Sequence, residues 1–209
     1  MYLPATFRID DPETLHDFIR RYNFGTLITH DDEGMQASHL TFILEPSSGV
    51  GGRLSGHMAR ANPQWQSLRP DIEVFVIFQG PHAYVSPSWY SVHPSVPTWN
   101  YTAVHAYGRP RLVEDQAATR SIVGQLIAQH EAGFEKRWAP EFSEDFWESM
   151  LRQIVAFEID LTRVECKFKL SQNRGRADRD NVAAEYEASS ESTLVELGRF
   201  MRSTPRLPD

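Results

Sequence analysis

The sequence has almost no cysteine and no long apolar run. Its 209 residues include one cysteine, Cys166, which excludes an intramolecular disulfide framework. The longest strongly apolar stretch is Val74 to Phe78, far short of the roughly 18 residues of a membrane span. The N-terminus has neither a basic start nor an apolar segment, so no signal peptide is predicted. Together these absences predict a cytoplasmic protein with no membrane partner.

Charge is missing from one long stretch of an otherwise charged chain. No Asp, Glu, Lys or Arg lies in the 35 residues from Val74 to Gly108, although charged residues make up 23% of the sequence. This stretch holds many aromatic side chains, which suit a flat conjugated ligand or a subunit interface, with core packing as the alternative for strand positions. The chain as a whole has a formal net charge of -7. Such a protein has no overall field that attracts nucleic acid, so a local cluster must hold any phosphate.

The hydrophobic pattern predicts a mainly β protein with added helices. Asp11 and Pro12 are typical of a helix start, and apolar residues at helical spacing follow as far as Tyr22. The period then changes to two, which predicts short antiparallel strands in a closed barrel or sandwich. The strands are expected over Phe24 to Thr29, Gln36 to Leu44, Arg53 to Gly56, Glu73 to Phe78, Ala83 to Ser86, Asn100 to Val113, Val155 to Thr162 and Cys166 to Leu170.

Loops and helices complete the predicted organisation. Turns are expected at His30 to Gly34 and in the Gly-rich segment Glu45 to Gly52, a helical turn at Asn62 to Leu68, and a Pro-rich loop over Ser86 to Thr98. A pair of helices is inserted at about residues 115–153. We expect one domain over residues 1–175, followed by a charged tail, residues 176–209, with a short helix around Leu194 to Met201.

Metal and nucleophile chemistry have little support in the sequence. Five of the eight histidines, His39, His57, His82, His93 and His105, lie within 67 residues, but no pair has metal-ligand spacing and no Cys or Glu cluster accompanies them. We therefore predict no metal site. Cys166 has no base beside it and is expected to be a buried, inert thiol. No nucleophile elbow, P-loop or dinucleotide-binding motif is present.

Two groups of residues could hold an anionic ligand. Lys167 and Lys169 share one face of a strand, and Ser171 to Arg174 extend this row of donors, which suits an anionic or polar ring ligand as well as a solvated strand face. The second group combines Ser55, Gly56 and Arg60 with a helix start at Asn62 and Pro63. These are the donors that a phosphate needs, although an ordinary strand-to-helix connection has the same residues.

Several strings of this sequence resemble one family. They are the hairpin residues Ser38-His39-Leu40, GHMARANPQW from Gly56 to Trp65, FQGPHAYVSPSWY from Phe78 to Tyr90, VPTWNYTAVHAYG from Val96 to Gly108 and KFKLSQNR from Lys167 to Arg174. The chain is similar, over about residues 1–175, to the PaiB-type FMN-binding negative transcriptional regulators.

The resemblance implies a flavin-binding split β-barrel, antiparallel and homodimeric, with FMN at the subunit interface. The ring system would lie along Ser38, His39, Leu40 and Thr41. The phosphate would lie at the end of the next strand and its turn, with Lys169, Gln172 and the region from Trp89 to Tyr101 closing the site from the partner chain. The remaining cofactor-binding residues are thus expected to be Leu54, Ser55, Ala59, Arg60 and Asn62, with Trp89 and Trp99 from the closing region.

The biological role implied by the resemblance is regulatory. Arg174, Arg176 and Arg179 form the main basic cluster, which Asp178 and Asp180 dilute, so a regulatory protein partner is as reasonable as direct contact with DNA. The alternative is a flavin-dependent oxidoreductase, such as a flavin reductase or an enzyme like pyridoxamine 5'-phosphate oxidase, because one barrel can host different chemistries. His39, His57 or His105 could then transfer a proton.

Overall fold

A computed structural model describes residues 1–32, 34–46 and 51–204 of the chain. Part of the predicted turn at His30 to Gly34, half of the Gly-rich segment from Glu45 to Gly52, and the end of the tail lie outside the described residues. The chain forms two compact units. Residues 1–15, 79–104 and 165 onward are unit 1, and residues 16–78 and 105–164 are unit 2.

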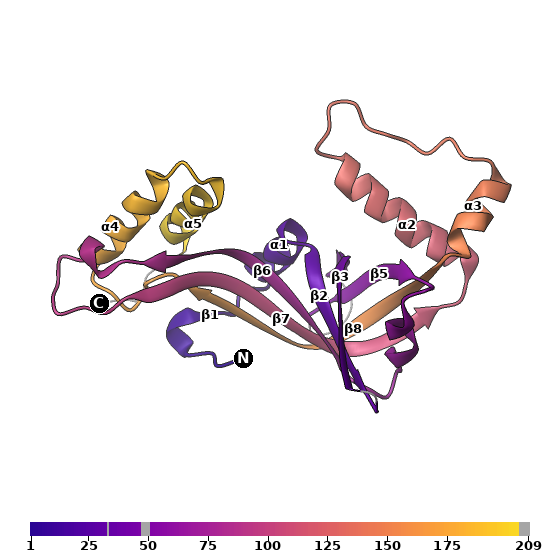
Figure 1. Ribbon diagram of the computed structural model, residues 1–209, viewed down its shortest axis with the longest axis horizontal. Coiled ribbons are helices and arrows are strands. Elements are labelled where there is room, and N and C mark those ends of the chain that lie inside the picture. The colour runs from indigo at the N-terminus through magenta and orange to yellow at the C-terminus, as the bar shows by residue number, and fades with distance from the viewer. Residues whose placement is uncertain (33, 47–50, 205–209) are drawn as a thin grey trace. The chain divides into compact units, whose positions relative to one another are not determined.

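The strands form one eight-stranded, mainly antiparallel sheet (Figure 1). Their order is β3-β2-β6-β7-β8-β5-β4, with β1 pairing β8. The bounds are β1 Arg8–Ile9, β2 Phe24–Asp31, β3 Gly34–Thr41, β4 Ile43–Glu45, β5 Arg53–Ala59, β6 Val74–Val85, β7 Thr98–Val113 and β8 Ile154–Lys169. The predicted hairpin is confirmed: β2 and β3 pair antiparallel, with Thr26 opposite His39.

Among the described residues, five α-helices and three short 3-10 helices accompany the sheet (Figure 1). The α-helices are α1 Pro12–Arg21, α2 Gln116–Glu131, α3 Glu144–Leu151, α4 Arg176–Glu187 and α5 Ser192–Ser203, and the 3-10 helices are η1 Ala5–Phe7, η2 Pro63–Ser67 and η3 Pro87–Trp89. Asp11 begins α1 as predicted, because its carboxylate accepts a hydrogen bond of 2.8 Å from the Thr14 amide. The inserted pair is confirmed as α2 and α3. No helix in the described part of the chain is long and apolar enough to cross a membrane.

Two strand predictions are wrong in the same way. The strands predicted at Glu73 to Phe78 and at Ala83 to Ser86 are parts of the single strand β6, Val74–Val85. Those predicted at Val155 to Thr162 and at Cys166 to Leu170 are parts of β8, Ile154–Lys169. Pro81 lies within β6, where proline's fixed φ is compatible with extended backbone. The Thr102 hydroxyl donates a 3.3 Å hydrogen bond to the Pro81 carbonyl, so this part of the strand keeps a polar partner.

Unit 2 contains a barrel-like core around Phe42. This side chain is 1% exposed at the junction between β3 and β4, and its ring meets those of Phe78 and Phe157 edge-on, at centroid distances of 5.6 and 6.2 Å. Gly108 allows the close approach of β8, because a Cβ there would lie 2.5 Å from the Asp160 carbonyl oxygen. In addition, β3 contacts β5, although these strands are not neighbours in the sheet order. The ends of the sheet therefore approach each other, as a barrel requires.

Unit 1 has its own core, formed largely by the C-terminal helices. The helices α4 and α5 pack against each other, and the buried side chains of Tyr186, Leu197 and Met201 come from them. The Tyr186 hydroxyl donates a 2.9 Å hydrogen bond to the Tyr84 carbonyl. The sequence predicted the region of α5, but it did not predict α4.

Candidate functional site

Two contacts in unit 2 show how β3 lies along β5. At one end, the missing side chain of Gly56 makes room for β3, since a Cβ would lie 3.2 Å from the Thr41 carbonyl oxygen. At the other end, the Asn62 amide donates a 2.9 Å hydrogen bond to the Ser38 hydroxyl. The predicted ring-binding strand and the predicted phosphate turn are therefore adjacent. Of the thirteen predicted cofactor residues, these elements carry Ser38, His39, Leu40, Thr41, Leu54, Ser55, Ala59, Arg60 and Asn62.

The strand β3 lies at one end of the sheet order and is half-exposed. His39 is exposed, its Nδ1 lies 3.0 Å from the Thr26 hydroxyl, and its ring stacks with that of Phe24 at a centroid distance of 6.1 Å. Phe24 and Met35 are exposed by 64% and 80%. An edge strand with a row of exposed apolar and aromatic side chains is well suited to a flat ligand or a second subunit.

The strand β5 contributes buried groups at its centre. Leu54 is fully buried in the core, and Ser55 is 2% exposed, with a hydroxyl that has no hydrogen-bond partner among the described residues. Burial lowers the pKa of His57, whose Nδ1 also has no partner there. The His57 imidazole is therefore neutral near pH 7, and the unpartnered Ser55 hydroxyl is a polar group that a ligand could satisfy.

Arg60 follows β5 and is held in place by its neighbours. Its guanidinium donates to the carbonyls of Arg152 and Ile154, at 2.9 and 2.8 Å, and the Trp65 indole donates to its carbonyl at 3.1 Å. Of the five guanidinium N–H groups, these bonds use two. Arg60 also lines a cavity of about 460 Å³ that includes Thr119. This fixed cation, with donors to spare, can bind an anion.

Gln64 is a structural residue that the sequence analysis missed. It is 1% exposed, and its Nε2 lies 3.2 Å from each of three acceptors: the Leu27 carbonyl, the Thr29 hydroxyl and the Gln36 carbonyl. It thereby ties η2 to β2 and β3 and fixes the turn that carries Arg60 and Asn62. One indication of its importance was present in the sequence: Gln64 lies in the string from Gly56 to Trp65 that carries the family resemblance.

The other four predicted residues, Trp89, Trp99, Lys169 and Gln172, belong to unit 1. Trp99 is 48% exposed and its indole N–H donates to His82 Nδ1 at 3.2 Å, whereas Trp89 meets the Tyr186 ring edge-on at 5.6 Å. The Gln172 amide is used by the chain itself, because it accepts from the Leu170 amide at 2.7 Å and donates to the Phe168 carbonyl at 2.5 Å. Trp99 is thus the most open of these aromatic groups.

The lysines of β8 and the predicted arginine cluster both use their side chains for contacts within the chain. Lys167 is 6% exposed and donates to the Tyr2 carbonyl at 2.8 Å, and Lys169 donates to the Thr98 hydroxyl at 2.6 Å. The predicted basic cluster is partly internal, because Arg179 is 5% exposed and donates to the carbonyls of Met201 and Thr204. Arg176, by contrast, has a side chain that is 80% exposed.

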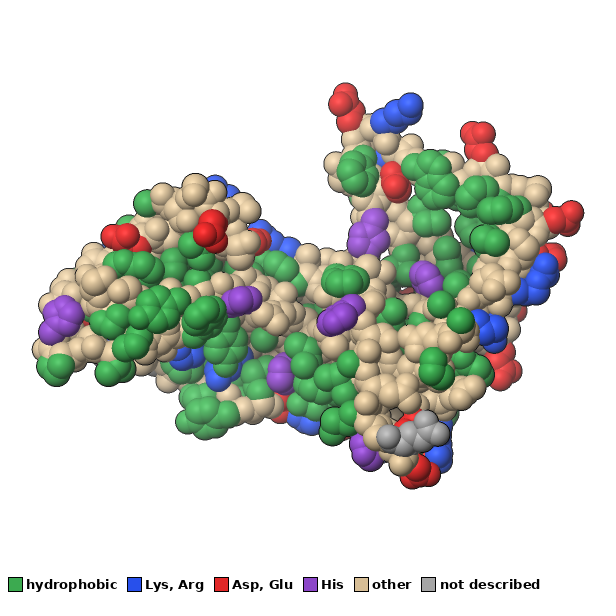
Figure 2. Space-filling model, viewed as in Figure 1, with side chains coloured by type: hydrophobic (Ala, Val, Ile, Leu, Met, Phe, Trp, Pro, Cys, Tyr) green, Lys and Arg blue, Asp and Glu red, His purple; other side chains and the backbone are tan. Residues whose placement is uncertain are grey.

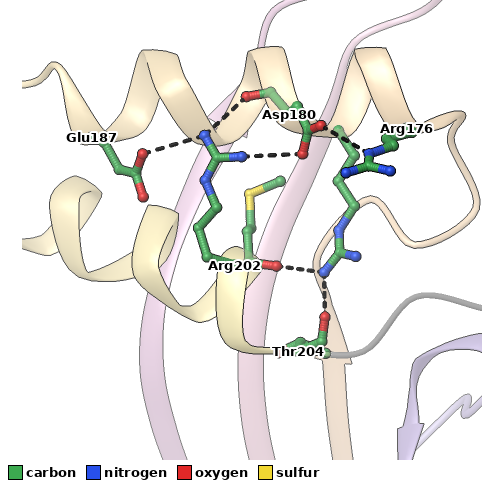
Figure 3. A network of polar contacts seen from close by, with 7 residues as sticks. Arg176, Asp180, Glu187, Arg202 and Thr204 are labelled. Atoms are coloured by element: carbon green, nitrogen blue, oxygen red, sulfur yellow. Dashed lines mark hydrogen bonds and ion pairs between the residues drawn. The ribbon is translucent and has the colours of Figure 1, made fainter.

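A network of ion pairs surrounds that arginine (Figure 3). Arg176 pairs with Asp180 at 3.6 Å, and Arg202 pairs with Asp180 at 3.1 Å and with Glu187 at 3.4 Å. The carboxylates offset the positive charge of this surface, as the sequence suggested. In the described part of the chain, no group of His, Cys, Asp and Glu side chains is arranged to hold a metal ion.

The fold and the comparisons with known proteins define a split-barrel flavoprotein. Residues 1–163 match the family described as "Putative FMN-binding domain", and the chain belongs to this family. It is 32% identical over 201 residues to the Bacillus subtilis PaiB protein, "Protease synthase and sporulation protein PAI 2", with 96% of each chain covered, and is a homologue of that protein. An uncharacterized protein of Emericella nidulans is also 32% identical, with 90% of each chain covered.

Solved structures support the fold. The flavocytochrome Anf3 from Azotobacter vinelandii has a TM-score of 0.59 at 14% identity, covering 78% of this chain and 69% of that chain. The FAD and heme binding protein from Mycobacterium smegmatis has a TM-score of 0.58 at 16% identity, covering 78% and 73%. The predicted antiparallel split-barrel fold is thereby confirmed, and the family match confirms the predicted family and FMN cofactor.

Proposed function

We propose that the chain binds FMN on unit 2, with the ring system along β3 and the phosphate at the end of β5. The observation that carries this proposal is the adjacency of β3 and β5, where Ser38 bonds to Asn62 and Thr41 lies against Gly56. The exposed face of β3 offers an aromatic and apolar surface to the flavin ring. When bound, FMN supplies one- and two-electron redox chemistry.

The polar residues of this site either contact the cofactor or hold another residue in position. Arg60, anchored through two backbone carbonyls, gives the phosphate a positive charge with remaining N–H donors. The buried Ser55 hydroxyl, which lacks a partner among the described residues, donates to the cofactor. Asn62 holds Ser38 in position, and His39 lines the ring. The barrel excludes water from one side of the ring.

We further propose a cytoplasmic homodimer in which the partner subunit's unit 1 closes the site. The exposed Phe24 and Met35 beside β3 support an interface there. Trp89, Trp99, Lys169 and Gln172 would then approach the flavin from the partner. Trp99 has the exposed ring that stacking requires, whereas Gln172 acts by shaping the turn after β8.

Titration of the apoprotein with FMN and with riboflavin tests this site. Riboflavin lacks the phosphate, so we expect it to bind at least ten-fold more weakly than FMN. Asn62→Ala should weaken both ligands, because Ser38 loses its partner, and Gln66→Ala, an exposed neighbour, serves as the matched control. Equal affinity for FMN and riboflavin would reject the phosphate site.

For the biological role, we propose negative regulation of transcription through a protein partner. The Bacillus subtilis relative is named for protease synthesis and sporulation. The segment from α2 to α3 carries an exposed aromatic face, and Figure 2 shows apolar side chains gathered over it. The face consists of Phe134, Trp138, Phe142, Phe146 and Met150. Six acidic and two basic residues lie in residues 131–150, so the charge favours a basic protein segment over DNA.

Transcript profiling of a deletion strain tests this role. Genes that become more active on deletion should be repressed again by the wild-type chain and by Arg176→Gln, but not by a chain with Phe134, Trp138 and Phe146 changed to Ser. The changed side chains are exposed, so the variant should fold and bind FMN. An unchanged transcript profile on deletion would reject regulation, and full repression by the triple variant would reject this docking face.

A further inference from the structure

Two cations in unit 1 share a small cavity whose described lining contains no acidic residue. The cavity has a volume of about 190 Å³. Its described lining residues are Tyr90, Val96, Pro97, Thr98, Asn100, Lys169, Ser171, Asn173 and Arg174, and none of them is Asp or Glu. Neither Lys169 nor Arg174 has a carboxylate partner among the described residues. Because unit 1 contains every lining residue, the cavity is complete within this unit.

Both cations are positioned with donors to spare. Lys169 Nζ donates to the Thr98 hydroxyl at 2.6 Å and to the Trp99 carbonyl at 2.5 Å, which leaves one of its three N–H groups. The Arg174 guanidinium lies 4.3 Å from the centre of the Tyr90 ring and donates to the Ser95 hydroxyl at 3.3 Å. Burial, and then the positive charge of Lys167, lower the pKa of Lys169. An anion in the cavity would offset both effects.

The polar wall of the cavity is rigid and strained. Ser171 adopts the left-handed region with φ of 61°, an uncommon conformation for a residue with a side chain. Its hydroxyl and the Asn100 side chain bond to each other in both directions, at 3.0 and 3.1 Å, and Asn100 is fully buried. The Tyr90 hydroxyl is buried without a hydrogen-bond partner among the described residues. Backbone strain held by buried polar groups often marks a ligand site.

We propose that this cavity binds a small oxyanion, a carboxylate or inorganic phosphate, between Lys169 and Arg174. At about 30 Å³ for each water in the liquid, the cavity has room for about six waters. This is smaller than the ~300–1,000 Å³ of a pocket for a larger organic ligand, so a flavin does not fit inside it. The cavity shares Lys169 with the residues proposed to approach the flavin from the partner, so the test below uses Arg174, which is not among the residues proposed to hold FMN.

Calorimetric titration of the full-length chain tests this site, with inorganic phosphate in one arm and acetate in the other. Chloride keeps the ionic strength constant, so general screening is the same throughout. We expect saturable binding of at least one oxyanion, at one site per chain. The arm that saturates at lower concentration identifies phosphate or carboxylate as the preferred chemistry. An absence of saturable binding in both arms would overturn the proposal.

Variants connect the binding to the cavity. Arg174→Gln should weaken oxyanion binding at least ten-fold, whereas Arg176→Gln, two residues further on and exposed, should leave it unchanged. Circular dichroism checks that the variants fold, and Arg174→Lys, which keeps the charge, should retain part of the affinity if Arg174→Gln is unstable. Equal weakening by the variants at positions 174 and 176 would contradict the site.

An FMN titration of the same variants separates the two proposals. Arg174→Gln should bind FMN as the wild type does. If it lost FMN and oxyanion in parallel, the cavity would belong to the flavin site and the inference would be wrong. Oxyanion binding by a chain that takes no FMN would reject the FMN site and leave this inference standing.

Discussion

At the scale of the residue, Arg60 combines a structural and a binding task. Its side chain ties the end of β5 to the carbonyls of Arg152 and Ile154, and its remaining donors are proposed for the FMN phosphate. We predict that Arg60→Ala weakens FMN binding by roughly ten-fold or more, because a hydrogen bond between charged groups contributes about 1.5–3 kcal/mol. Quenching of flavin fluorescence during titration measures the affinity.

The control for this change is another arginine of unit 2. Arg69 is exposed and pairs with Asp71 at 2.8 Å, so Arg69→Ala removes the same charge away from the site. It should leave FMN affinity within about two-fold of the wild type, since exposed ion pairs contribute little. Similar affinities for the two variants would remove Arg60 from the phosphate site.

Cys166 gives a second prediction at this scale. The thiol is 1% exposed, and burial, followed by the negative charge of Asp10, raises its pKa to about 12. Ellman's reagent should therefore label the native protein very slowly at pH 8 and the unfolded protein at once. The folded pKa lies above the unfolded one, so this group favours the folded state below about pH 9 and loses that effect as the pH rises. Rapid labelling of native protein would contradict this burial.

The types of residue in the sequence predicted which chemical groups are present better than they predicted what surrounds each group in the fold. The burial of Cys166 was correctly predicted, and the row from Lys167 to Arg174 was recognised as a row of donors. The spacing of these residues could not show which of them bind within the chain and which line a cavity. Lys167 donates to the Tyr2 carbonyl, whereas Lys169 and Arg174 line a cavity. These differences depend on contacts with residues distant in sequence.

At the scale of the element, three glycines make a graded test of strand packing. A Cβ at Gly108 would lie 2.5 Å from the backbone oxygen of Asp160, one at Gly56 would lie 3.2 Å from the Thr41 oxygen, and one at Gly124 would meet nothing within 4 Å. We predict that Gly108→Ala destabilises the protein most and that Gly56→Ala costs about 1–3 kcal/mol. Gly124→Ala, within α2, should stabilise it by about 1 kcal/mol.

Urea denaturation gives the free energies of unfolding for this series. A Gly108→Ala protein as stable as the wild type would mean that β7 and β8 do not approach as closely as the structure has them. Loss of stability in Gly124→Ala would mean that the open face of α2 is covered.

The elements also show where sequence patterns fail. The helix α4 was missed because its buried face includes Asp178 and Arg179, which interrupt the apolar period that predicts a helix. The Asp178 carboxylate accepts from the Ser91 amide at 2.6 Å, and only that distant contact explains its burial. By contrast, α1 and the β2–β3 hairpin were predicted because their capping residue, turn and period all agree.

At the scale of the whole molecule, the proposed dimer makes a direct prediction. Light scattering should give about twice the 23.9 kDa of one chain. A chain with Phe24→Asp and Met35→Asp should shift toward monomer and bind FMN more weakly, since charges on that apolar face would be desolvated in the interface. Phe134→Asp changes an exposed apolar residue between α2 and α3, and this control should leave the dimer intact. A monomeric wild-type chain that still binds FMN would reject the dimeric site.

The lack of charge from Val74 to Gly108 is explained by where this stretch lies in the whole fold. It became β6, η3 and the first part of β7, with Phe78 and Val104 fully buried and Tyr84 and Trp99 each 48% exposed. Its lack of charge therefore reflects core packing in part and an open aromatic surface in part. The sequence alone could not divide the stretch in this way, because burial depends on which strands pair.

The most direct measurement of the central claim is the visible absorbance spectrum of the purified full-length chain, before and after adding FMN and removing the excess. We predict a flavin spectrum with about one FMN per chain, and a loss of most of that signal in Arg60→Ala. A colourless protein that retains no FMN after incubation would contradict FMN binding by this chain.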